Sequence, residues 1–253
     1  MGEQLPSGAR IYRHKADDAG DWHAPLYAGR YIEEIEPFLG GFLGQQAGVF
    51  HEILSDKIHL DILIFPPNDN RNNWTFVTSG MSDLPMNVPE GLQPRSDFEF
   101  AELFIVLPAD WFKASEDGMV PEDQLKEGAK YWPIRLLKFL ARLPHEYGSW
   151  VWASHTFVSA ESREPYHSST RLCASLLVDA NICWISGSNT LPTKDGNKIN
   201  FFCILPLYAD ELMIALNKGV ESLAPLLDRA GVNEVIAPNR PSVVPRKRFL
   251  GLF

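Results

Sequence analysis

The residues best suited to chemistry lie close together in the first quarter of the chain, at His51, Glu52, His59 and Asp61. Imidazole nitrogens and carboxylate oxygens bind zinc and related ions, and the same groups transfer protons. In a strand, His59 and Asp61 project from one face because side chains alternate. His51 can approach them across a hairpin, so the spacing allows a small metal site.

A structural interpretation of these residues competes with the metal site. Metalloproteases carry His-Glu-X-X-His on one helix, whereas Leu54 and Ser55 occupy the later positions here. We favour hydrogen bonds between His59 and Asp61, or from them to loop backbone, that fix the hairpin. The alternative is a metal-dependent enzyme that uses His51, His59 and Asp61.

Other catalytic patterns are missing from the sequence. The run Thr78–Ser82 lacks the Gly-X-Ser-X-Gly turn of serine hydrolases, and no cysteine lies beside a histidine. Neither a Gly-X-Gly-X-X-Gly pattern nor a P-loop occurs, so no nucleotide cofactor is indicated. We therefore predict a protein that is not an enzyme and has no cofactor and no bound metal.

Two tryptophans point to a different kind of site. The segment Gly148–Ser154 is typical of a strand, and Trp150 and Trp152 lie one period apart, so their rings share a face. Such a pair usually belongs to the core. If the face or the strand edge is open, the pair forms a binding hot spot, because aromatic side chains dominate interface energies.

The histidines must be positioned by a hairpin with strands at Ala47–Leu54 and Ile58–Phe65 and a turn at Ser55-Asp56. Pro66-Pro67 ends the second strand, since proline has no N–H for a sheet. We expect this strand to be half-buried. Its buried face carries Ile58, Leu60, Ile62 and Ile64, and its other face carries Lys57, His59, Asp61, Leu63 and Phe65.

The other periodic segments predict the rest of the fold. The predicted helices are Leu26–Phe38, Pro133–Arg142, Glu211–Lys218 with Asp210 as its cap, and Val220–Arg229. The predicted strands are Trp74–Ser79, Phe98–Leu107, Leu172–Trp184 and Ile199–Leu205, and residues 110–130 are expected to be a mobile excursion. This order predicts a single α+β domain with a mixed, mostly antiparallel β-sheet flanked by helices. The domain spans residues 26–235, between an N-terminal lead-in (1–25) and a C-terminal tail (236–253).

Composition narrows the possible partners. The chain has 253 residues and a net charge of −9, so it repels a phosphate backbone and is not expected to bind nucleic acid. Its basic run, Arg246-Lys247-Arg248, is interpreted as a solvated tail. Neither a signal peptide nor the run of about 18 apolar residues that a membrane helix needs is visible, which predicts a cytoplasmic protein. Cys173, Cys183 and Cys203 lie in apolar segments and are predicted to be buried, reduced thiols.

Several short motifs, in their order and spacing, resemble the Suppressor of fused domain. They are His51-Glu-Ile-Leu-Ser-Asp-Lys-Ile-His-Leu-Asp61, Thr78-Ser-Gly-Met-Ser-Asp-Leu-Pro-Met86, Phe98-Glu-Phe-Ala-Glu-Leu103, Tyr131-Trp-Pro133, Leu140-Ala-Arg142, and Asn200-Phe-Phe-Cys-Ile-Leu205 before Ala209-Asp-Glu-Leu212. The resemblance covers Phe38 to Val235. The length is similar to that of the stand-alone bacterial members. The animal protein has a second, C-terminal domain, which this chain is too short to hold.

This resemblance implies a non-catalytic α+β domain that binds another protein. The animal family member binds the transcription factor Gli, whose peptide lies as a β-strand against the domain. Many bacterial members are regarded as immunity proteins that neutralise toxins, and the acidity of this chain suits a basic toxin domain. A structural subunit that forms a homodimer through an exposed strand edge is a further alternative.

The resemblance also implies where to look for a partner. Ser149 takes the place of the acidic residue of the animal peptide site, so a Gli-like ligand is not expected, but strand addition is retained as the binding mode. The predicted partner-binding residues are Ser149, Trp150, Val151, Trp152 and Ser154. The motif residues to which we assign a structural role are His51, Glu52, Asp56, His59, Asp61, Ser79, Gly80, Asp83, Pro85 and Met86.

Overall fold

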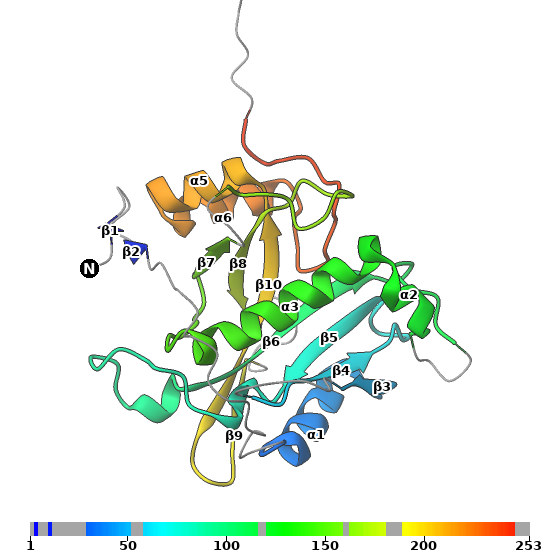
Figure 1. Cartoon of the computed structure of the whole chain (residues 1–253), viewed down its shortest axis with the longest axis vertical. Coiled ribbons are helices and arrows are strands. Elements are labelled where there is room, and N and C mark those ends of the chain that lie inside the picture. The colour runs from blue at the N-terminus through cyan, green and yellow to red at the C-terminus, as the bar shows by residue number, and fades with distance from the viewer. Residues whose placement is uncertain are drawn as a thin grey trace, which may run out of the picture.

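Figure 1 shows the computed structural model of the protein, which describes residues 3–4, 10–11, 29–51, 58–115, 120–158, 162–180 and 189–245. An eight-stranded sheet with strand order β3-β4-β5-β6-β10-β8-β7 organises the chain, and β9 pairs with one end of β10. These strands are β3 (Gly48–Phe50), β4 (Asp61–Phe65), β5 (Asn73–Ser79), β6 (Phe100–Pro108), β7 (Thr156–Val158), β8 (Ala174–Asp179), β9 (Thr190–Pro192) and β10 (Lys198–Leu207). Two short strands, β1 (Glu3–Gln4) and β2 (Arg10–Ile11), pair with each other.

The sheet is mixed, because β6 and β10 run parallel while the other pairs are antiparallel. The helices are α1 (Ile32–Leu43), α2 (Glu122–Lys126), α3 (Gly128–Glu146), α5 (Ala209–Lys218) and α6 (Val220–Arg229), with 3₁₀ turns η1 (Met81–Asp83) and η2 (Arg95–Asp97). The predicted class, a single α+β domain with a mostly antiparallel sheet flanked by helices, is confirmed.

Both faces of the sheet are buried, which corrects the expectation of a half-buried strand at β4. Ile62 and Ile64 pack in the core under α3, whereas Leu63 and Phe65 point the other way and are covered by α1. Figure 1 shows α3 crossing the front of the sheet. The alternation along β4 is as predicted, but its second face is also buried, because α1, which precedes the hairpin in the chain, packs over it.

The predicted hairpin is confirmed as the antiparallel pair of β3 and β4. Val49 is opposite Leu63, and Phe50 is opposite Ile62. The turn predicted at Ser55-Asp56 lies outside the described residues, as does Glu52. Because β3 is the outermost strand of the sheet, the hairpin forms one of its two margins.

Several predicted helix bounds were wrong. Helix α1 begins at Ile32, continues beyond Phe38 to Leu43, and ends at Gly44, whose φ of +88° suits glycine. Helix α3 is longer than predicted at both ends, so Pro133 lies inside it. Helix α2 occupies part of the predicted excursion 110–130.

The C-terminal helices differ from the prediction in one detail. Helix α6 has the predicted bounds, but α5 is capped by Tyr208 and not by Asp210. The Tyr208 N–H donates to the carboxylate of Glu211, which also receives the guanidinium of Arg240. The backbone N–H of Ile236 donates to the carbonyl of Val106, so the segment after α6 packs back against the sheet.

Two further expectations concern cysteines and membranes. Cys173 and Cys203 are free and buried, as predicted, and Cys183 lies outside the described residues. Within the described ranges, no helix combines the length and apolar character needed to cross a bilayer.

Gly80 provides a test of the packing between β4 and η1. Its φ is +115°, and a Cβ there would lie 2.0 Å from the carbonyl oxygen of His59. We expect Gly80→Ala to lower the free energy of unfolding by about 3 kcal/mol, since it combines backbone strain with a clash against backbone. Gly91→Ala is the control, because a Cβ there meets nothing within 4 Å. Urea unfolding of both variants measures the difference, and equal stability would contradict the described contact.

Candidate functional site

A fully buried carboxylate, that of Glu102 on β6, organises the loop that follows β5. Its Oε1 accepts hydrogen bonds from the backbone N–H of Gly80 (3.0 Å), and from the backbone N–H (2.9 Å) and hydroxyl (2.6 Å) of Ser82. Its Oε2 accepts a hydrogen bond of 2.6 Å from the hydroxyl of Thr78. The Thr78–Met86 motif therefore wraps around one acidic side chain of the neighbouring strand.

The environment of Glu102 changes its acidity. Burial, with a smaller contribution from the nearby Asp83, raises the pKa of this carboxyl from 4.5 to about 7, although the hydrogen bonds from Ser82 and Thr78 oppose the shift. Burial thus outweighs the hydrogen bonds that stabilise the charged form. Among the described residues, no Lys, Arg or His forms an ion pair with this carboxyl.

Asp83 connects the same motif to the start of α1. Its carboxylate accepts hydrogen bonds from the backbone N–H groups of Gly29 (2.8 Å) and Arg30 (2.9 Å). Burial raises the pKa of Asp83, although both hydrogen bonds favour its charged form. On the other side of η1, the Nε2 of His145 lies 2.8 Å from the carbonyl oxygen of Met81, which ties η1 to the end of α3.

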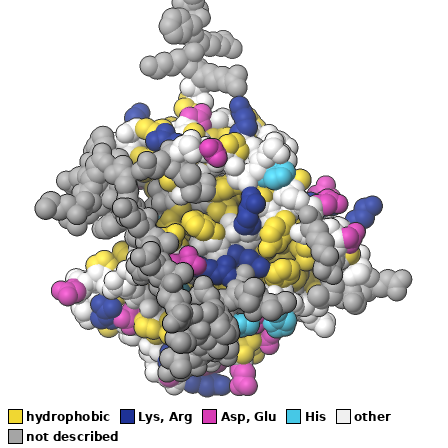
Figure 2. All heavy atoms as spheres, viewed as in Figure 1, with side chains coloured by type: hydrophobic (Ala, Val, Ile, Leu, Met, Phe, Trp, Pro, Cys, Tyr) yellow, Lys and Arg dark blue, Asp and Glu magenta, His cyan; other side chains and the backbone are white. Residues whose placement is uncertain are grey.

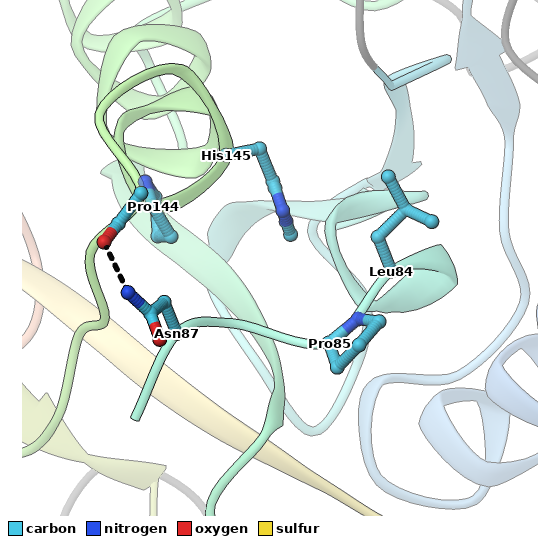
Figure 3. A pocket seen from close by; sticks show the side chains of 6 residues that line it. Leu84, Pro85, Asn87, Pro144 and His145 are labelled. Atoms are coloured by element: carbon cyan, nitrogen blue, oxygen red, sulfur yellow. Dashed lines mark hydrogen bonds between the residues drawn. The ribbon is translucent and has the colours of Figure 1, made fainter. Parts of the chain in front are cut away.

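An open pocket of about 370 Å³ lies between this motif and the end of α3 (Figure 3). Its lining is mainly apolar and comprises Leu84, Pro85, Asn87, Pro144, His145 and Gly148. The Asn87 side chain donates a hydrogen bond of 2.8 Å to the carbonyl of Gly148, so one wall of the pocket joins the two segments. Of the predicted motif residues, Pro85 lines the pocket, Met86 is buried beside it, and Ser79 ends β5.

The segment from Gly148 to Ser154 is not a strand, and the prediction was wrong here. The Ser149 N–H donates to the carbonyl of Pro144 (2.8 Å), and the Ser149 carbonyl accepts from the N–H of Asn87 (3.0 Å). These backbone groups bond to a helix end and a loop, so the segment lies outside the sheet until β7 begins at Thr156.

The predicted pairing of the two tryptophan rings is observed, although no strand imposes it. The ring centroids of Trp150 and Trp152 are 6.2 Å apart. Trp152 packs against Phe202 of the core, while Trp150 contacts the ring of His155 edge-on at 4.9 Å. Both indoles are half-buried, and Val151 between them is fully buried. Both rings pack against the core cluster, Trp152 directly on Phe202 and Trp150 beside His155.

The strand that follows forms the second margin of the sheet. Ser154 has a φ of +70°, and its N–H donates to the carbonyl of Leu177 while the Leu177 N–H donates to the carbonyl of His155. This irregular turn leads into β7, which pairs with β8 on one side. No described strand pairs with the other side of β7. Val158 on this strand is 39% exposed.

The imidazole and carboxylate cluster lies at the opposite margin. Asp61 Oδ1 is 3.0 Å from His51 Nδ1 and 3.1 Å from His59 Nε2. The expected contact between His59 and Asp61 is therefore present, and His51 reaches them across the hairpin. Two other residues of this motif, Glu52 and Asp56, lie outside the described residues.

The family of this chain follows from its match to a protein-family model. The sequence model of the family described as Suppressor of fused protein (SUFU) matches residues 56–241, more than half of the chain. The chain belongs to the Suppressor of fused family. No curated protein matches the sequence.

Solved structures of the family share this architecture. A protein described as a Suppressor of fused homologue from Neisseria gonorrhoeae is similar with a TM-score of 0.55 and 18% identity, over 85% of this chain and 95% of that chain. The Sufu–Fu complex gives a TM-score of 0.56 and 18% identity, over 86% and 93%. Drosophila Suppressor of Fused gives a TM-score of 0.58 and 17% identity, over 85% of this chain and 52% of that chain.

The sequence alone did not reveal the roles of three residues that build this region. Glu102 was treated as one of the polar residues that alternate with apolar ones along β6, yet it is buried. Asn87 and His145 were not singled out, although their side chains join the pocket walls. A run of small hydroxyl and glycine residues at 78–82, rich in hydrogen-bond donors, was the available signal for a buried acceptor nearby.

The acidity of Glu102 predicts an unusual dependence of stability on pH. Between pH 4.5 and about 7 the folded protein keeps a proton that the unfolded chain loses, so stability falls as pH rises through this window. Glu102→Gln removes the ionisation and keeps the shape. We expect the wild-type protein to lose on the order of 3 kcal/mol more than this variant between pH 4 and pH 8. Urea unfolding across this range measures the difference, and identical pH profiles would contradict it.

Proposed function

We propose that this protein is a non-catalytic domain that binds another protein, through the surface formed by residues 148–158 and the adjoining pocket. One observation carries the proposal. A pocket wall at Gly148, the half-buried ring of Trp150 and a β7 edge that pairs with no described strand follow one another along a single stretch of chain. The Sufu–Fu complex, a structure of the same fold, supports a protein as the partner.

Strand addition is the binding mode that the β7 edge favours. The Leu177 N–H donates to the carbonyl of His155, so alternation directs the N–H groups of Thr156 and Val158 away from β8. A partner segment in extended conformation can bond to these groups, and pockets for its alternate side chains would give specificity. The proposed contacts include Ser149 and Ser154, which flank the tryptophans.

The surroundings suit a protein partner. The pocket presents apolar atoms of Leu84, Pro85 and Pro144 beside the polar groups of Asn87 and His145, a mixture that is typical of protein interfaces. On the face that α3 crosses, exposed hydrophobic side chains lie beside Lys and Arg side chains (Figure 2), and Phe139 of α3 is 36% exposed. Trp150 is the proposed hot spot, because Trp152 is held by the core.

The biological role that we propose is that of an immunity or antitoxin-type protein in the cytoplasm, bound to a toxin domain. The net charge of −9 supports a basic partner, since complementary charge speeds association and disfavours wrong partners. In such a role the protein acts by covering a surface of its partner. It needs no reacting group of its own.

Trp150→Ala tests the surface. Loss of a central aromatic side chain typically costs about 2 kcal/mol or more of binding free energy, so we expect at least a tenfold weaker complex. The matched control is Trp111→Ala. Trp111 is also half-buried and packs on the same core, but it lies near the start of α3, whereas Trp150 follows its end.

The measurement is a quantitative pull-down from the native host with the full chain, followed by titration of the purified partner. We expect a protein that is enriched by the wild type and by Trp111→Ala, and lost with Trp150→Ala. Enrichment of no protein would contradict the function, and equal enrichment by both variants would contradict the surface.

Val158→Pro tests strand addition separately. Proline removes the outward N–H of Val158 without breaking a bond to β8, so folding should be retained while binding is lost. Val158→Thr is the control, since it keeps both the N–H and the β-branched shape. Isothermal titration with the same partner compares them. Undiminished binding by the proline variant would rule out pairing at this edge.

A further inference from the structure

A second site of a different kind lies at the opposite margin of the sheet, on the hairpin of β3 and β4. Three possible ligand atoms converge there: Nδ1 of His51, Nε2 of His59 and a carboxylate oxygen of Asp61. All three lie within 4.8 Å of one another, and both nitrogens are about equally close to Asp61 Oδ1, at 3.0 and 3.1 Å. His51 directly follows β3, His59 precedes β4, and Asp61 is the first residue of β4.

We propose that His51, His59 and Asp61 bind one divalent transition-metal ion of the zinc class. In tetrahedral zinc sites the Zn–N and Zn–O bonds measure about 2.0–2.2 Å, which places neighbouring ligand atoms roughly 3.4 Å apart. The two observed separations from Asp61 are within about 0.4 Å of that spacing. Small side-chain rotations are therefore enough to admit an ion between the three atoms.

The chemistry of the donors selects the class of metal. Two imidazole nitrogens with one carboxylate oxygen form a borderline set that suits zinc, cobalt, nickel or copper. Calcium and magnesium prefer oxygen ligands alone. A dication bound between the three groups would be attracted by the carboxylate of Asp61. Asp83 adds negative charge near His59.

The supporting structure fixes two of the three ligands. Asp61 begins β4 and pairs with Ser79 of β5, so its backbone is held by the sheet. The carbonyl of His59 lies directly against Gly80, which leaves no room for a different backbone path. The third ligand, His51, follows β3 and has a 66% exposed side chain, so it can adjust to an incoming ion.

An ion at this site would act as a cross-link within the hairpin. It would connect the outermost strand β3 to β4, at the margin of the sheet that lies farthest along the strand order from β7. With three protein ligands a fourth coordination position is left for water. The metal is thus independent of the protein-binding surface proposed above, and either proposal can fail without the other.

Zinc titration of the purified full chain tests this site. Any affinity tag is removed and bound metal is stripped with a chelator, because tags and impurities also bind zinc. Isothermal titration with zinc chloride, checked by metal analysis after dialysis, should give one equivalent for the wild type. Zinc should also raise the melting temperature, since an ion that binds only the folded state stabilises it.

The variants His51→Ala and His59→Ala should each lose the bound equivalent and the zinc-dependent rise in melting temperature. His167→Ala is the matched control, because His167 is half-buried like His59 and contacts Ser169 far along the chain from the cluster. Circular dichroism of the metal-free variants checks that they fold. Because the His51 side chain is exposed, we expect His51→Ala to disturb the fold less than His59→Ala. Cobalt in place of zinc should give the visible absorption of a tetrahedral site.

Two results would overturn the proposal. One is a wild-type protein that takes up no zinc or cobalt. The other is uptake that His51→Ala and His59→Ala retain to the same extent as His167→Ala, which would place the metal elsewhere.

Discussion

The buried carboxylate of Glu102 is the constraint on which this region of the fold depends. A group that is expensive to bury is kept in the core because four donors from one short stretch of chain surround it. Without it, the backbone N–H groups of Gly80 and Ser82 would lose their acceptor. This mutual requirement fixes the path of residues 78–83 against β6. An apolar side chain in place of Glu102 would leave backbone N–H groups buried and unpaired.

The proposed binding surface is built outward from this point. η1, which Glu102 holds, contacts the end of α3 through His145, and the loop that follows it bonds to Ser149 through Asn87. Residues 148–149 are thus attached to the family motif, while Ser154 at the other end of the segment bonds to Leu177 of β8. This arrangement explains how a scaffold motif and a recognition surface are connected, although they are far apart in the sequence.

The sequence predicted the structural elements that depend on local residue patterns. The hairpin of β3 and β4, the strands β5 and β10 and helix α6 follow from periodicity and turn residues. Features that depend on contacts between distant parts of the chain could not be predicted from the sequence. The alternation in Gly148–Ser154 resembles a strand, but its backbone bonds go to Pro144 and Asn87. The burial of Glu102 is not visible in the sequence, because its donors lie on β5 and in the turn that follows it, and α1 continues beyond the predicted end at Phe38.

Hydrogen–deuterium exchange of Glu102→Ala against the wild-type protein tests the central claim, that Glu102 positions the proposed binding surface. We predict faster exchange of the amides in residues 80–87 and also in residues 148–158, while α5 and α6, which pack in a separate cluster, keep their protection. Faster exchange that is confined to residues 80–87, with residues 148–158 as protected as in the wild type, would contradict the account.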